Sequence, residues 1–197
     1  MALLPTLTAT YPEAGVDEAG RGALAGPVVA AAIILPQGYS NPDINDSKQL
    51  TDAQRRHLRD KLLIDAVAWN LGILSHTEID RINIFQAAMQ AMCQAVEGLS
   101  MQPLHLAIDG HKFVPHTISY TCVIKGDARY LHIAAASILA KTFRDDIMLH
   151  LHTQHPEYGW AANKGYPTPA HRRAIAELGA TPWHRKSFRL LPDPVLF

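Results

Sequence analysis

Acidic residues follow three predicted strands of this 197-residue chain, at the point where each strand ends. Asp17 and Glu18 close the first apolar strand. Asp109 closes a middle strand, and Asp127 follows the next one. Open α/β sheets bind their ligands at strand ends, so neighbouring strands would gather four carboxylates at one edge. Each acid taken alone is more often a turn residue or a surface charge, and only the combined pattern predicts a site.

Four clustered carboxylates repel one another unless a cation lies between them. Oxygen ligands select Mg²⁺ or Mn²⁺, and the sequence offers no cluster of cysteine and histidine for zinc. Two such ions roughly 4 Å apart can activate water and stabilise the leaving oxygen of a phosphodiester. We therefore predict metal-assisted phosphodiester hydrolysis, with Asp17, Glu18, Asp109 and Asp127 as catalytic residues and ligands of Mg²⁺ or Mn²⁺.

Composition favours a protein of the cytoplasm. No apolar run approaches the roughly 20 residues that span a bilayer, and the N-terminus lacks the charged region of a signal peptide. Two cysteines suggest no disulfide framework. The first 124 residues hold 8 basic against 12 acidic side chains, and the remainder hold 10 against 6. The second part could meet phosphates, although chance asymmetry explains this distribution equally well.

The order of predicted elements indicates one α/β domain over residues 1–197. Strands are predicted around 13–18, 28–35, 67–71, 104–108 and 117–124, and helices over 51–65, 78–97, 131–152 and 168–178. Loops are predicted over 38–48 and 156–169. Because strands come first and helices dominate later, we expect a central mixed β-sheet flanked by helices. Residues from about 150 to 197 would form a helical and loop extension that contributes to substrate binding.

A dinucleotide fingerprint is the main competing pattern. Residues 20–25, Gly-Arg-Gly-Ala-Leu-Ala, satisfy it, and Asp43 lies at a suitable distance. That fingerprint opens a helix, whereas Pro27 and a β-branched run follow here. The acidic pair just upstream would also repel a pyrophosphate. A nicotinamide oxidoreductase is therefore the weaker hypothesis.

Six sequence blocks resemble those of the ribonuclease HII family, in the family's order and across residues 14–188. The blocks are Asp17-Glu18-Ala19-Gly20-Arg21-Gly22 with 25–31, Asp46-Ser47-Lys48-Gln49-Leu50, Asp109-Gly110, Lys125-Gly126-Asp127-Ala128 with 133–141 and Arg144-Asp145, Gly165-Tyr166-Pro167-Thr168 with His171, and His184-Arg185-Lys186-Ser187-Phe188. The one departure is Gln49, where a second lysine is common. Type III enzymes differ after the acidic pair and usually carry an extra N-terminal domain.

The resemblance implies a ribonuclease H-like fold and an endonuclease that cuts the RNA strand of RNA–DNA hybrids. It also implies cleavage 5′ of single ribonucleotides embedded in duplex DNA, with 3′-hydroxyl and 5′-phosphate products and Mg²⁺ or Mn²⁺ as cofactor. Ribonucleotide excision repair and removal of RNA primers would follow from that activity. The family's four carboxylates correspond to Asp17, Glu18, Asp109 and Asp127. A hybrid-binding module that has lost catalysis is the alternative, which the intact acidic set disfavours.

Further residues are expected to contact the nucleic acid. Only the 2′-hydroxyl separates RNA from DNA at one position, and the resemblance assigns its sensing to Gly20, Arg21 and Gly22. It assigns Tyr166 to the sugar at the RNA–DNA junction. Candidate phosphate contacts and their helix neighbour are Lys48, Ser137, Lys141, Lys164 and Arg185.

Other positions favour structural roles or remain open. For each lysine alone, a solvated surface role is equally plausible. His171 and His184 are interpreted as structural histidines. The last four residues, Pro194-Val195-Leu196-Phe197, could dock a sliding clamp but lack the upstream glutamine, and we interpret them as a hydrophobic tail. The protein is expected to be a monomer.

Overall fold

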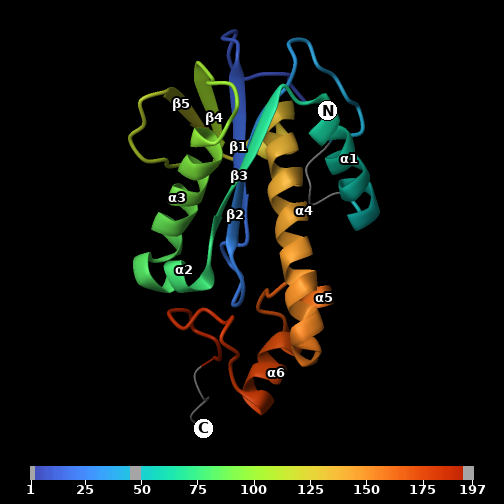
Figure 1. Cartoon of the computed structure of the whole chain (residues 1–197), viewed down its shortest axis with the longest axis vertical. Coiled ribbons are helices and arrows are strands. Elements are labelled where there is room, and N and C mark those ends of the chain that lie inside the picture. Colours follow the sequence, from blue (N-terminus) through green and yellow to red (C-terminus); the bar gives the residue numbers. More distant parts are fainter. Residues whose placement is uncertain (1–2, 45–49, 193–197) are drawn as a thin grey trace.

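A five-stranded mixed sheet forms the centre of the computed structural model, which describes residues 3–44 and 50–192 (Figure 1). The strands are β1 (Glu13–Ala19), β2 (Val28–Ile34), β3 (Ala68–Leu74), β4 (His105–Asp109) and β5 (Ser119–Val123). Their order across the sheet is β3-β2-β1-β4-β5. β1 pairs antiparallel with β2 and parallel with β4, which in turn pairs parallel with β5. The mixed sheet predicted from the sequence is confirmed.

Helices cover both faces of this sheet. They are α1 (Asp52–Asp65), α2 (His76–Ile82), α3 (Ile84–Glu97), α4 (Leu131–Gln154), α5 (Trp160–Asn163) and α6 (Pro169–Leu178), with two 3₁₀ turns, η1 (Gly126–Ala128) and η2 (Pro156–Tyr158). Figure 1 shows α3 and α4 on opposite sides of the strands. One core cluster lies under α3, and a second joins the other face of the sheet to α1 and α4.

Two glycines let helices approach the sheet closely. A Cβ on Gly15 of β1 would lie 2.3 Å from the backbone of His132 in α4. A Cβ on Gly72 of β3 would lie 1.9 Å from the carbonyl oxygen of Ala91 in α3. Backbone can pack against backbone at these positions because no side chain intervenes. The long helix α4 is thereby seated directly against β1, the strand that carries the acidic pair.

One predicted helix is wrong as a single element. The segment predicted over 78–97 forms α2 and α3, separated at Asn83, whose φ of 66° is incompatible with a continuous helix. The Asn83 side chain accepts a hydrogen bond from Gln86 N at 3.1 Å and caps α3. Asparagine tolerates positive φ better than most residues, which explains why the break falls there.

The segment that follows α4, residues 155–192, lies below the sheet, as Figure 1 shows. The predicted loop over 156–169 contains η2 and the short α5, so the expectation of an entirely irregular segment is wrong. Trp160 and Tyr158 pack with Met148 of α4, Ile175 of α6 and Leu24 of the β1–β2 loop. Within the described residues, no helix is long and apolar enough to cross a membrane.

Candidate active site

The ends of β1 and β4 bring two of the predicted acids side by side. The parallel register pairs Val16 with Ile108, so Asp17 and Asp109 follow at adjacent positions of the same sheet edge. Asp109 Oδ1 accepts a hydrogen bond of 2.7 Å from Gly126 N, at the start of η1. That bond fixes the turn carrying Asp127 at the end of β5, beside the same edge. Local strand order therefore explains how residues remote in sequence meet.

The carboxylates lie close enough to change one another's ionisation. Asp17 is buried, and this burial, with the negative charges of Glu18 and Asp109, holds its pKa well above the usual value. Hydrogen bonds from Ser137 and from Glu18 N oppose that rise only in part. Burial also raises the pKa of Glu18, although Arg21 lies 3.2 Å away and counteracts it. The edge thus concentrates negative charge that a cation would stabilise.

The donor chemistry of this edge fits a hard divalent cation, because Asp17, Glu18 and Asp109 offer only oxygen ligands. Within residues 3–44 and 50–192, however, no three acidic, histidine or cysteine side chains are already arranged to hold a metal ion. Glu18 Oε1 is paired with Arg21, and Asp17 Oδ1 accepts from the backbone. Both carboxylates are thus already engaged in hydrogen bonds within the chain.

Two buried arginines hold the loop between β1 and β2 in place. Arg185 donates to the carbonyl oxygens of Gly20 at 2.7 Å and Arg21 at 2.9 Å, and also to Gly26 and Pro27. Arg144 donates to Ala25, Pro27 and Lys164. Both side chains are fully buried. Burial and the nearby Arg144 lower the pKa of Arg185 to about 9, so it stays charged at neutral pH.

A chain of hydrogen bonds in the segment that follows α4 fixes the backbone of Tyr166. The carbonyl oxygen of Tyr166 can only accept, so His171 Nδ1 donates to it over 3.0 Å. His171 Nε2 then accepts from Trp160 Nε1 at 2.9 Å and faces His184 Nε2 at 3.1 Å. Burial lowers the pKa of both histidines, so both are neutral near pH 7. The predicted structural role of His171 and His184 agrees with this arrangement.

One open cleft joins most of the residues predicted to form the site. Its lining includes Asp17, Glu18, Gly20, Arg21, Gly22, Asp109, Ser137, Lys141 and Tyr166. The Tyr166 ring stands in front of the Arg144 guanidinium, whose carbon lies 5.2 Å from the ring centre. Carboxylates, a glycine loop and an aromatic ring therefore share one surface.

Other predicted residues lie elsewhere. Asp127 is buried and does not line the cleft. Lys164 donates to Ala161 O, outside the lining, and Arg185 lies beneath the loop with no exposed surface. These two side chains support neighbouring backbone in this structure. Lys48 lies outside the described residues, as does the C-terminal tail at 194–197.

Two cationic residues beside the cleft had no role assigned from the sequence. Arg55 of α1 lines the cleft, and Arg144 underlies both the glycine loop and Tyr166. A helix with arginines at 55, 56 and 59 gives no signal for which one faces a site. The glycine loop leads into β2 and opens no helix, which excludes the dinucleotide-binding geometry.

Known proteins resemble this chain over nearly its whole length. A family model described as Ribonuclease HII matches residues 14–191. A ribonuclease HII from Bacteroides thetaiotaomicron is 57% identical over 192 residues, which is 97% of this chain and 96% of that protein.

Solved structures agree with the fold. Ribonuclease H2 from Pyrococcus horikoshii aligns with a TM-score of 0.76 and 26% identity, covering 90% of this chain and 94% of that one. The PCNA:RNase HII complex from Archaeoglobus fulgidus aligns with a TM-score of 0.73 and 23% identity, covering 88% and 92%.

Proposed function

Since this chain belongs to the ribonuclease HII family and is a ribonuclease H, we propose that it cuts RNA–DNA hybrids and also cleaves 5′ of single ribonucleotides in duplex DNA. The products would carry 3′-hydroxyl and 5′-phosphate ends. Such an activity would serve ribonucleotide excision repair and the removal of RNA primers. The observation that carries the proposal is the shared cleft, in which three carboxylates adjoin the Gly20–Gly22 loop and Tyr166.

Asp17, Glu18 and Asp109 would hold the divalent ions, Mg²⁺ or Mn²⁺, with Asp127 as the fourth ligand. When bound, two such ions supply an activated water and stabilisation of the leaving oxygen. The chain's own contribution is to bury the carboxylates of Asp17 and Glu18. This burial removes them from water and thereby raises their pKa values. Asp109 in addition fixes the turn that carries Asp127, through its bond with Gly126 N.

The glycine loop would recognise the 2′-hydroxyl. Arg185 occupies the carbonyl oxygens of Gly20 and Arg21 from behind and so holds the loop backbone rigid. Gly22 is exposed, and a Cβ added there would meet nothing within 4 Å, so a sugar can approach this backbone. A hydroxyl is both donor and acceptor, and rigid backbone groups at close range can discriminate it from hydrogen.

Tyr166 would select the sugar of the nucleotide that follows the ribonucleotide, because a 2′-hydroxyl on that sugar would collide with the tyrosine ring. Its backbone is fixed by His171, and its ring stands against Arg144, so little freedom remains for adjustment. A rigid ring enforces steric selection better than a mobile one, because displacing it would break these contacts.

The proposal also covers the partners of the protein, its oligomeric state and its location in the cell. Recruitment by a sliding clamp is a prediction that the Archaeoglobus fulgidus complex makes worth testing, since that protein was solved with PCNA. A monomeric state, one catalytic domain with a substrate-binding C-terminal extension, and the cytoplasm as location also stay predictions.

The test is cleavage of a DNA duplex containing one ribonucleotide, with an all-DNA duplex as the control. With Mg²⁺ or Mn²⁺ we expect a single cut 5′ of the ribonucleotide, and end-labelling would identify the 3′-hydroxyl and 5′-phosphate. Asp17→Asn should lower the cleavage rate by at least about 100-fold, because it removes one negatively charged ligand of the metal ions. The affinity of this variant for the duplex should be retained. Binding without cleavage by the unmodified protein would instead favour a hybrid-binding module, and robust turnover by Asp17→Asn would remove Asp17 from the catalytic set.

A further inference from the structure

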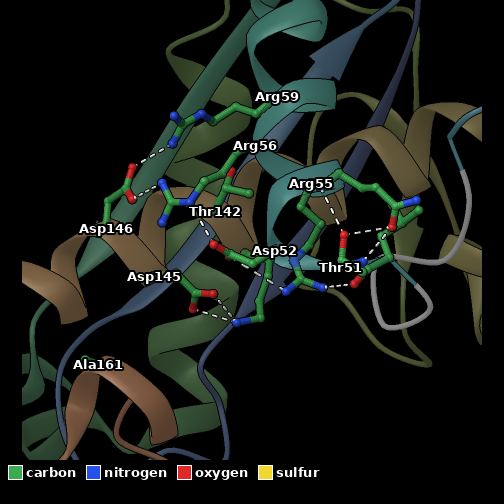
Figure 2. A network of polar contacts seen from close by, with 12 residues as sticks. Thr51, Asp52, Arg55, Arg56, Arg59, Thr142, Asp145, Asp146 and Ala161 are labelled. Carbon is green, nitrogen blue, oxygen red and sulfur yellow. Dashed lines mark hydrogen bonds and ion pairs between the residues drawn. The ribbon is translucent and has the colours of Figure 1, made fainter.

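One carboxylate can join two segments that lie far apart in this chain. Between α1 and α4, Asp146 accepts hydrogen bonds of 2.6 Å from both Arg56 and Arg59, as Figure 2 shows. A second carboxylate of this kind is Asp80 of α2, whose hydrogen-bond donors follow 106 and 107 residues later in the sequence. Figure 1 shows α2 beside the last described segment of the chain. Asp80 therefore connects α2 with the segment that follows α4.

Asp80 accepts three hydrogen bonds from two consecutive residues. Lys186 N donates to Oδ2 over 2.8 Å, and Ser187 donates to Oδ1 through its N at 2.9 Å and its Oγ at 2.6 Å. Successive backbone N–H groups in a turn form a concave site for an anion, and the Asp80 carboxylate fills it. Burial alone would raise the pKa of Asp80, but these bonds hold it below its usual value. The side chain is therefore a carboxylate at neutral pH.

Helix α2 holds Asp80 at a fixed place. The neighbouring Ile79 is fully buried in the core cluster under α3, so this turn of the helix cannot move independently of the sheet. At the start of the same helix, the His76 ring packs edge-on against Trp183, with 5.2 Å between the ring centres. Contacts from α2 thus lie on both sides of Arg185 in the sequence, at Trp183 before it and at the partners of Asp80 after it.

Arg185 is the residue that these contacts position. Phe188 N donates to Arg185 O at 3.0 Å, so the two residues that Asp80 binds form the middle of a turn that Arg185 begins. The buried guanidinium of Arg185 in turn holds two carbonyl oxygens of the glycine loop. Burial and, after it, the positive charge of Arg144 lower the pKa of Arg185, and the negative charge of Asp80 is one of the causes that oppose this fall. Asp80 thus fixes the backbone beside Arg185 and favours its charged form.

We propose that Asp80 is a positioning residue for recognition of the ribonucleotide, because it fixes Arg185 and Arg185 fixes the backbone of the Gly20–Gly22 loop. This inference rests on the proposed function, in which that loop recognises the 2′-hydroxyl. Asp80 is not among the described residues that line the cleft, so it would act on selectivity without touching the nucleic acid. Its loss would leave the loop free to shift, and the backbone groups would no longer be held at the distance that distinguishes a hydroxyl from hydrogen.

The ratio of two binding affinities tests this role. In an Asp17→Asn background, in which cleavage is expected to be negligible, fluorescence anisotropy would give the Kd for a duplex with one ribonucleotide and for the all-DNA duplex of the same sequence. Asp80→Asn should lower the preference for the ribonucleotide by roughly 3- to 30-fold, because the amide lacks the charge and presents an NH₂ group to a backbone N–H. The affinity for the all-DNA duplex should stay the same, since phosphate contacts determine it. A role in folding alone would weaken both affinities by the same factor.

Glu78→Gln is the matched control, since it makes the same change from carboxylate to amide on the same helix. Glu78 accepts hydrogen bonds from Ser75 at the start of α2, and a glutamine can replace it in that capping box. The ribonucleotide preference of this variant should equal that of the parent. An equal loss of preference in Glu78→Gln, or an unchanged preference in Asp80→Asn, would overturn the role of Asp80.

Ser187→Ala covers the case in which Asp80→Asn does not fold. It removes one of the three hydrogen bonds to Asp80 and leaves both backbone bonds, so the preference should fall in the same direction by a smaller factor. If this is the only variant that folds, an unchanged preference would count against the proposal. Failure of the proposed function is a separate result, because the unmodified protein would then not cut the ribonucleotide-containing duplex at all.

Discussion

Mild acid should destabilise this protein through the buried imidazole of His184. The side chain has no exposed surface, and its Nδ1 accepts a hydrogen bond from Thr181 N at 2.9 Å. A proton on Nδ1 would replace that bond with a repulsion between two donors. Burial, followed by the neighbouring His171, lowers the pKa of His184 to about 4. The folded protein therefore resists protonation that the unfolded chain accepts.

The magnitude follows from proton linkage. An unfolded histidine has a pKa of about 6.5, so between about pH 6.5 and about pH 4 the unfolded chain binds more protons. The stabilisation from His184 is then fully present above about pH 6.5 and is lost as the pH falls. For these two pKa values the loss between about pH 7.5 and about pH 5 is about 2 kcal/mol. The active-site acids act in the opposite direction, because their raised pKa values favour protonation in the folded state.

A variant comparison separates these opposing effects. Urea unfolding of the unmodified protein and of His184→Gln would be followed by tryptophan fluorescence at both pH values. The unmodified protein should be the more stable at neutral pH, and its advantage should shrink by about 2 kcal/mol in acid. His57→Gln, on the exposed face of α1, controls for surface charge. A difference between His184→Gln and its parent that stays constant with pH would refute the reasoning.

Two glycine substitutions test how closely packed backbone supports the site and the sheet. Gly20→Ala combines a φ of 98° with a Cβ placed 2.0 Å from Arg144 Nε. The backbone strain alone costs about 1–2 kcal/mol, so both unfolding temperature and cleavage rate should fall, whereas Gly22→Ala, with open space around it, should fold normally. A Gly20→Ala protein as stable as its parent would contradict the described loop. Gly72→Ala should lower the free energy of unfolding in urea by about 1–3 kcal/mol, because β3 and α3 must move apart. Under conditions in which the variant is fully folded, its cleavage rate should change little.

The sheet and the three cleft acids were predictable because local patterns determine them. Asp17 and Asp109 each end an apolar strand, and parallel pairing places such ends at one edge. The helix predicted over 51–65 likewise agrees with α1, whose start is marked by a capping box between Thr51 and Gln54. The strand order and the direction of each pairing are tertiary properties, and the sequence patterns contained no signal for them.

The remaining features depend on contacts between distant segments. A continuous helical stripe predicted one helix over 78–97, because periodicity does not register the single positive φ at Asn83. The local sequence around a lysine or arginine does not show whether its side chain is exposed at the surface or buried against backbone carbonyl oxygens. Arg185 was therefore predicted to contact phosphate, although its guanidinium lies beneath the Gly20 loop. Arg55 was overlooked for the same reason, since its neighbours on α1 have the same residue type.

The glycine loop can be completed only late in biosynthesis. Leu24 N donates to Gly165 O at 2.7 Å, and Gly26 N donates to Trp183 O at 3.0 Å. Arg185 closes the same loop from the far end of the chain. A ribosome-bound chain that already contains all four predicted acidic ligands still lacks these partners until residue 185 has left the exit tunnel. A prematurely terminated product that stops before Trp183 would then carry these acids without the shaped glycine loop beside them.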